Sequence, residues 1–148
     1  MFRKVLYPTD FSDVAGKAMG YLKQLKDAGT EEVVILHVVD ARYIHRNLHI
    51  PMHYALKDFS ELEEKYAIEA QDAANSLAET LTEMGFEVKV RIERGIPFKE
   101  ILRVESEEDV SLIVIGSHGR SNVEEMLLGS VSEKVIRKAK KPVLVVKR

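Results

Sequence analysis

The sequence predicts a doubly wound α/β domain, in which helices cover both faces of a five-stranded parallel sheet of order 3-2-1-4-5. Two observations predict it. Short apolar runs rich in β-branched residues, typical of strands buried on both faces, alternate along the chain with longer segments of helical periodicity. With five strands and four helices in alternation, right-handed crossovers build an open sheet. The 148 residues hold no internal repeat or linker, so we expect one domain over 1–148.

The five expected strands are of two kinds. Those at 5–7, 33–39, 112–115 and 143–146 are continuously apolar. The strand at 86–93 instead alternates between apolar and charged residues, which leaves one of its faces exposed to solvent. Its charges deter pairing with other chains, so it suits an edge of the sheet.

The first expected helix begins after Ser12, its N-cap, and ends before Gly29. Its apolar stripe consists of Val14, Ala18, Leu22 and Leu25. Gly16 and Gly20 each cost about 1 kcal/mol relative to alanine in a helix, so we expect them to permit close packing on the sheet.

The later helices follow from the same periodicity. A long helix spans 59–84 and is closed by Gly85, a short helix begins at Pro97, and the segment from 121 to about 138 is helical with an interruption. The segment 41–57 is longer than a typical loop between a strand and a helix, and we interpret it as a lid-like insertion that is mobile without ligand.

Composition excludes several function classes. The net charge is −2 with both signs interspersed, which argues against a nucleic-acid partner. The absence of cysteine excludes disulfides and thiolate-bound metals. No signal-peptide pattern or membrane-length apolar stretch is present, so we expect a cytoplasmic protein without a membrane partner.

The ligand site is expected where the strand order reverses, outside the carboxyl ends of the first and fourth strands. The first strand ends at Pro8, Thr9 and Asp10, and the fourth ends at Gly116, where a glycine-rich turn begins. Asp10 and this turn should therefore face one crevice. As an alternative, Asp10 serves only to cap the first helix.

The turn GSHGRSNVEEMLLGS, residues 116–130, contains the start of two helices. Ser121 to Glu124 and Ser130 to Glu133 both have the spacing of a capping box. Two helix N-termini with free N–H groups, beside glycines that permit close backbone approach, predict a seat for a polyphosphate. His118 and Arg120 could supplement it. A purely structural turn is the alternative.

Other phosphate motifs are absent. The chain has neither the P-loop pattern GxxxxGK[ST] nor GxGxxG after its first strand. No aspartate ends the third strand, where Glu93-Arg94-Gly95 stands instead, so a response regulator is excluded.

The spacing Gly116-x2-Gly119-x9-Gly129-Ser130 resembles the nucleotide-binding signature of the ATP-binding branch of the universal stress protein family. Four further landmarks resemble that family in order and position: Tyr7-Pro8-Thr9-Asp10, Leu36-His37-Val38, Gly95-Ile96-Pro97 and the stretch from Lys141 to Val146. The resemblance covers the chain except for 41–57. It implies a Rossmann-like, adenine nucleotide alpha hydrolase-like fold and an ATP-binding protein of the stress response.

The resemblance also implies roles for single residues. Pro8, Thr9 and Asp10 would line adenine and ribose, and the backbone of Val38 would bind the adenine ring. Gly116, Gly119 and the nearby Ser117, His118, Arg120, Ser121 and Asn122 would contact ribose and phosphates. Gly129, Ser130, Val131 and Ser132 would hold the phosphate tail. Mg²⁺ would accompany the triphosphate.

The histidines have simpler interpretations. His37 lies inside an apolar strand and is expected to be a core histidine with one satisfied hydrogen bond. His45, His49 and His53 have a spacing that suits a metal site, but Pro51 would interrupt a helix there and no carboxylate lies among them. We therefore expect no metal ligands in the chain.

The leading functional hypothesis is a nucleotide-dependent regulatory switch without catalytic residues. One alternative is a slow ATPase or an adenylyl-transferring enzyme on the same fold, although the HxGH motif of nucleotidyl transferases is absent. Another is an interaction module with a vestigial pocket. We also expect a homodimer through the strand at 143–146, which is apolar on both faces and therefore unprotected at an edge. The resemblance to the universal stress protein family implies the same, since its ATP-binding members commonly dimerise through this strand.

Overall fold

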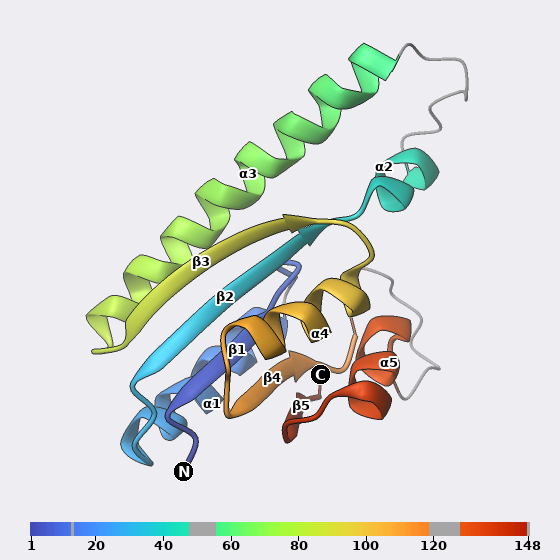
Figure 1. The fold of residues 1–148 in the computed structure, drawn as a ribbon. Coiled ribbons are helices and arrows are strands. Elements are labelled where there is room, and N and C mark those ends of the chain that lie inside the picture. The colour runs from blue at the N-terminus through green and yellow to red at the C-terminus, as the bar shows by residue number, and fades with distance from the viewer. Residues whose placement is uncertain (13, 48–55, 119–127, 148) are drawn as a thin grey trace.

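The computed structural model describes residues 1–12, 14–47, 56–118 and 128–147. Its strands form one parallel sheet of order β3-β2-β1-β4-β5, so the predicted fold class and strand order are confirmed (Figure 1). The strands are β1 (Lys4–Pro8), β2 (Glu32–Val39), β3 (Glu87–Arg94), β4 (Leu112–Gly116) and β5 (Val143–Val146). The central strand β1 therefore has β2 on one side and β4 on the other.

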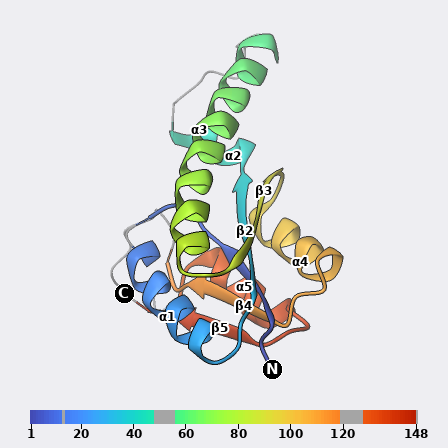
Figure 2. The ribbon, with the colours of Figure 1, turned by 90° about the vertical axis from the view of Figure 1, so that its left-hand side faces the viewer.

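Helices cover both faces of this sheet. Figure 2 shows α1 (Val14–Asp27) and α3 (Leu56–Glu83) on one face and α4 (Pro97–Glu107) on the other, which also carries α5 (Ser130–Lys138). Each face has its own hydrophobic core, and successive residues of β1 alternate between them: Val5 and Tyr7 pack toward α1 and α3, whereas Leu6 packs toward α4 and α5. Burial on both faces explains why the inner strands are apolar without interruption.

The glycines predicted to end the first two helices do so. Gly29 and Gly85 have φ angles of 104° and 93°, in the left-handed region that favours glycine. Behind each glycine the chain bonds back to the last turn of the helix, as when the Thr30 amide donates to the Leu25 carbonyl at 2.9 Å. This is the Schellman pattern of helix termination.

The lid-like insertion 41–57 contains a helix that the sequence prediction lacks. After β2, α2 (Ala41–Asn47) begins with Asp40 as its N-cap, since the Asp40 carboxylate accepts the Arg42 amide at 3.0 Å. Ile44 of α2 is buried. Helix α3 already begins at Leu56, and 48–55 lie outside the described residues.

Helix α3 is longer than the sheet that it covers. Its 28 residues span about 42 Å at 1.5 Å per residue, whereas the eight residues of β2 span about 26 Å. Its N-terminal end therefore extends past the ends of β2 and β3 (Figures 1 and 2). Within the ranges that the structure describes, no helix combines the length and apolarity needed to cross a membrane.

The charged face of β3 is paired with α4 rather than simply exposed to solvent. Arg91 forms ion pairs with Glu93, Glu107 and Glu108. Glu108 also forms ion pairs with Lys4 at 3.1 Å and with Lys89 at 2.7 Å. On the opposite face of the same strand, Val88, Val90 and Ile92 join the core under α3. The predicted alternation of β3 is confirmed, and the ion pairs attach this edge strand to the rest of the sheet.

Candidate functional site

The carboxyl ends of β1, β2 and β4 lie together at one edge of the sheet. The register pairs Pro8 with Leu36 and Leu6 with Ile113, so Thr9 continues toward Gly116. This edge brings together the predicted site residues at the strand ends, which are Pro8, Thr9, Asp10, Val38, Gly116, Ser117 and His118. It is the place expected for a ligand in an open parallel sheet.

A tightly bonded turn follows β1. The Thr9 hydroxyl accepts the Phe11 amide at 3.0 Å, and the Asp10 carboxylate accepts the Ser12 amide at 2.9 Å. Phe11 has a φ of 62°, a left-handed conformation that costs a residue with a large side chain about 1–2 kcal/mol. Asp10 thus shapes the turn before α1. Burial raises the pKa of the Tyr7 phenol beneath this turn, opposed by its hydrogen bond with Thr9.

His37 supports the same turn from β2. Its Nδ1 lies 2.8 Å from the Thr9 carbonyl oxygen and donates to it, because a carbonyl only accepts. Its ring stacks on Phe11, with centroids 5.0 Å apart and planes inclined by 26°. The sequence predicts a core histidine with one hydrogen bond. That bond is present, but His37 is only half-buried and lies at the candidate site.

The main chain of Val38 faces the space beyond the end of β1. In a strand of a parallel sheet, each residue directs its N–H and C=O groups to the same neighbouring strand, and successive residues alternate between the two neighbours. The Leu36 carbonyl accepts the Thr9 amide at 2.9 Å and so faces β1, whereas the Val39 carbonyl accepts Gly95 and faces β3. Val38 therefore faces the side of β1, past the last bond that joins the two strands. A donor and an acceptor next to each other suit the edge of a planar ring.

The turn after β4 is tied together at its two ends. The Gly129 amide donates to the Ser117 carbonyl at 2.6 Å, and the Ser132 hydroxyl donates to the Gly116 carbonyl at 2.7 Å. Ser117 and Ser132 are both buried. These bonds hold the start of α5 against the carboxyl end of β4, with Ser130 exposed and Val131 half-buried in its first turn.

The second predicted capping box is wrong. The N-cap of α5 is Gly129, with φ −70° and ψ 160°, and Ser130 is already the first helical residue. The hydroxyl of Ser132 is used by Gly116, and Glu133 pairs with Arg137 at 2.9 Å instead of reaching back to the cap. Because Gly129 has no side chain, the N-cap residue itself provides no acceptor for the first amides of α5.

The middle of the glycine turn lies outside the described residues. This applies to Gly119, Arg120, Ser121 and Asn122 and to the first predicted capping box. His118 is described, and its Nδ1 lies 2.9 Å from the Ser117 hydroxyl. His49 and His53 are not described, and the residues that the structure does describe include no group of three side chains that could hold a metal ion.

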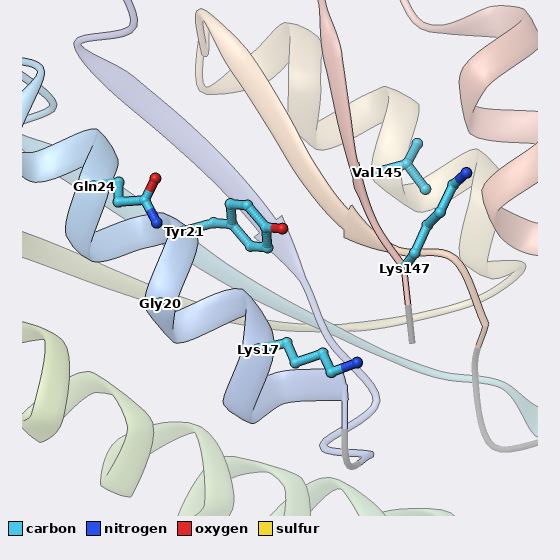
Figure 3. A pocket seen from close by; sticks show the side chains of 6 residues that line it. All are labelled: Lys17, Gly20, Tyr21, Gln24, Val145 and Lys147. Atoms are coloured by element: carbon cyan, nitrogen blue, oxygen red, sulfur yellow. The ribbon is translucent and has the colours of Figure 1, made fainter.

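An open groove of about 480 Å³ lies between α1 and β5. It is lined by Lys17, Gly20, Tyr21, Gln24, Val145 and Lys147 (Figure 3). The expectation that Gly20 permits close packing on the sheet is wrong, since a Cβ built there would meet nothing within 4 Å. Gly20 faces the groove beside the outer edge of β5.

Glu105 is a structurally important residue that sequence reasoning missed. It lies on the buried face of α4, only 2% exposed, and its Oε1 accepts the amides of Lys140 and Lys141 at 2.8 and 2.7 Å. It thereby holds the turn that leads from α5 into β5. A carboxylate at an apolar helix position, next to Ile101 and Val104, was the available signal.

Comparison with known proteins agrees with this architecture. The sequence model described as the Universal stress protein family matches residues 1–147. The universal stress protein MJ0577 of Methanocaldococcus jannaschii is 42% identical over 156 residues, covering all of this chain and 96% of that protein. A solved structure of MJ0577 matches with a TM-score of 0.88 at 43% identity, over 100% of this chain and 97% of the other.

Two more distant structures contain adenine nucleotides. A universal stress protein from Archaeoglobus fulgidus in complex with dAMP has a TM-score of 0.64 at 22% identity, over 99% of this chain and 100% of the other. Another universal stress protein, in complex with cAMP, has a TM-score of 0.60 at 23% identity, over 99% and 97%. At these identities the similarity establishes a common fold.

Proposed function

Because the chain belongs to the universal stress protein family, we propose that it binds ATP at the carboxyl ends of β1, β2 and β4 and acts as a nucleotide-dependent regulatory protein of the stress response. The observation that carries the proposal is the start of α5. The carbonyls of Ser117 and Gly116 hold it beside the end of β4, and its first amides receive no side-chain bond from the N-cap residue Gly129. Such amides, at the positive end of a helix dipole, favour phosphate.

Within this proposal the ligand lies across the sheet edge from β2 to α5. The Val38 main chain binds the edge of adenine, while Pro8, Thr9 and Asp10 line the base and ribose. The main-chain amides of Ser130, Val131 and Ser132 bind the phosphate tail together with Gly129. Gly116, Ser117 and His118, with Gly119, Arg120, Ser121 and Asn122 of the undescribed turn, enclose ribose and phosphates. Complexes of related proteins with dAMP and cAMP support an adenine nucleotide.

Mg²⁺ enters this proposal through the nucleotide. The groups proposed to bind the phosphate tail are the main-chain amides at the start of α5, which suit phosphate oxygens rather than a cation. Mg²⁺ prefers oxygen ligands and commonly binds through substrate phosphates. We therefore assign the ion to the phosphate oxygens and no protein side chain to a dedicated metal site.

The identity of the nucleotide is tested by calorimetry with ATP and GTP. Adenine offers the Val38 main chain a complementary donor and acceptor, whereas guanine presents the opposite pattern and leaves buried groups unpaired. We expect ATP to bind more tightly by about 1–3 kcal/mol. Equal affinities would contradict the assignment of Val38.

The regulatory and enzymatic alternatives are separated by the nucleotide that the purified protein retains. Chromatography of the material released on denaturation identifies it. We expect ATP, because the switch requires a stable bound triphosphate. Recovery of ADP alone, together with steady phosphate release from added ATP, would favour the slow ATPase. A chain that neither retains nor binds nucleotide would be an interaction module with a vestigial site.

The proposed assembly is a homodimer through β5. The amides of Ile113 and Ser117 donate to the carbonyls of Pro142 and Val146. The even-numbered residues of β5 therefore direct their main-chain groups toward β4. The main-chain groups of Val143 and Val145 therefore face the outer edge of the sheet. An apolar edge strand with outward donors and acceptors favours antiparallel pairing with a second copy across a two-fold axis.

A further inference from the structure

His37 lies beside a position where the sheet could have continued and does not. The register pairs Pro8 with Leu36, so in a longer β1 Asp10 would lie opposite Val38. In a parallel ladder, the Val38 amide would then donate to the Thr9 carbonyl, and the Val38 carbonyl would accept the Phe11 amide. Two ordinary main-chain bonds would occupy both groups of Val38.

Both of the groups that would close this ladder are occupied by side chains. The Thr9 carbonyl accepts a hydrogen bond from Nδ1 of His37 at 2.8 Å, and the Phe11 amide donates to the Thr9 hydroxyl at 3.0 Å. The two bonds substitute for the missing pair, so the turn satisfies its polar groups without using Val38. Satisfied polar groups are what permits a partly buried chain segment to leave a sheet.

The ring of His37 makes a second contact that favours the same turn. It stacks on Phe11, whose φ of 62° is unfavourable for a residue with a Cβ atom. Phe11 is also packed against the core under α1 and α3. A strained residue persists where its surroundings overdetermine its conformation, and such residues gather at functional sites.

We propose that His37 is a positioning residue of the nucleotide site: by bonding the Thr9 carbonyl and stacking on Phe11, it holds the turn after β1 in the conformation that leaves the Val38 main chain open to a ligand. This inference rests on the proposed nucleotide binding and adds to it a residue that would not itself contact the ligand. Both the neutral Nδ1–H tautomer and the imidazolium donate through Nδ1, so the role does not depend on the charge of the ring.

The two contacts of His37 are separated by two substitutions. His37→Asn retains an N–H donor close to the position of Nδ1 and loses the ring. His37→Phe retains a ring over Phe11 and loses the donor. Phe86→Leu serves as the control for stability, because Phe86 is a buried member of the same core at the opposite end of the sheet.

The first readout is affinity for ATP by calorimetry, measured beside the melting temperature. For His37→Phe we expect at least a tenfold loss of affinity, and for His37→Asn a smaller loss, because the Thr9 carbonyl keeps its donor. Phe86→Leu should lower the melting temperature with affinity unchanged. Unchanged ATP affinity in His37→Phe, with ATP bound by the unsubstituted protein, would overturn the role of His37.

The second readout needs no nucleotide. Amide exchange should be fast at Val38 in the unsubstituted protein and slower in His37→Phe, because the Thr9 carbonyl becomes free to accept the Val38 amide. The same fast exchange in both proteins would show that His37 does not keep Val38 open. If the unsubstituted protein binds no ATP while Val38 responds as expected, the proposed function fails and the structural part of this inference survives.

Discussion

At the scale of single residues, Glu105 shows how one buried group can fix a distant element. Its carboxylate on α4 accepts two successive amides of the turn before β5. These bonds join residues 35 and 36 positions apart, so they constrain the edge strand and not only the local turn. A buried amide without an acceptor costs about 1–3 kcal/mol.

Two substitutions of Glu105 distinguish the contribution of its acceptor oxygen to stability from that of its negative charge. Glu105→Gln keeps one carbonyl oxygen and should lower the free energy of unfolding by about 1 kcal/mol, whereas Glu105→Ala leaves both amides unpaired and should cost about 2–4 kcal/mol. Urea denaturation measures both. Glu79→Gln, on the exposed face of α3, is the control. Equal effects of the Gln and Ala variants would argue against the role of the two amides.

Gly20 leads to a prediction of the opposite sign. It lies inside α1, and a Cβ there meets no atom within 4 Å. Gly20→Ala should therefore stabilise the protein by about 0.5–1 kcal/mol through helix propensity and a less flexible unfolded chain. Thermal unfolding measures the change. A loss of stability would mean that another molecule approaches the backbone at the groove between α1 and β5.

These residues also show where sequence reasoning ends. The glycines after α1 and α3 were predictable because a helix end is a local event with a fixed backbone requirement. The left-handed Phe11 and the buried Glu105 were not, since each depends on a partner brought close only by the fold: His37 for one, and the turn before β5 for the other. The expectation that Gly20 packs closely on the sheet was wrong because it, too, depended on which part of the fold lies beside this face of α1.

At the scale of elements, the ion pairs between β3 and α4 attach an edge strand. Glu108 follows the last turn of α4 and contacts Lys89 of β3, Lys4 of β1 and Arg91 of β3. Lys89 first, with Lys4 and Arg91, lowers the pKa of the Glu108 carboxyl from its ordinary value of 4.5 to about 2. The carboxyl is only 7% exposed, although Lys89 is largely solvated and its share is screened.

The low pKa of Glu108 makes a contribution to stability that acid removes. A carboxyl with a depressed folded pKa stabilises the protein above its unfolded value of about 4.5, and this stabilisation disappears as the pH falls toward 2. We expect Glu108→Gln to cost about 1–2 kcal/mol at pH 7 and much less at about pH 2.5. Urea denaturation between pH 7 and pH 2.5 measures the difference. A cost independent of pH would assign the effect to packing.

The start of α5 illustrates a limit at the same scale. Two Ser-x-x-Glu patterns predicted two helix starts, and the one at Ser130 lies a single residue from the observed N-cap. The prediction failed because the Ser132 hydroxyl donates to the Gly116 carbonyl of β4. This contact between two elements replaces the local capping box that the sequence pattern predicted. The helix was predictable from its period, whereas its first residue depended on tertiary contacts.

At the scale of the whole molecule, the doubly wound architecture was predictable because continuous apolar runs require a sheet covered on both faces. The alternating pattern also placed 86–93 correctly at an edge, as β3, whereas the continuously apolar run 143–146 follows from the expected strand order 3-2-1-4-5 and is the other edge, β5. Helix α2 escaped prediction because its single apolar turn around Ile44 is too short for a period to emerge.

The proposed homodimer is tested by two prolines in β5. Val145→Pro removes an amide that faces the outer edge, so the sheet should remain intact while a dimer dissociates. Leu144→Pro removes an amide that faces β4 and should cost about 1–3 kcal/mol of folding stability. Light scattering and thermal unfolding separate the two effects. A monomeric unsubstituted protein at micromolar concentration would refute the pairing of β5.

The central position of β1 has a consequence for the order in which the chain matures. A ribosome releases β1 long before its partner β4, which lies more than a hundred residues later, as the bond between Lys4 and Ser111 shows. The chain from β1 to the end of β3 contains β1, β2, β3, α1 and α3. These elements can begin to form the core under α1 and α3 while the edge of β1 that later pairs with β4 stays open. Until 112–116 emerge, that nascent intermediate exposes an apolar strand edge, the kind of surface on which chaperones act and aggregation begins.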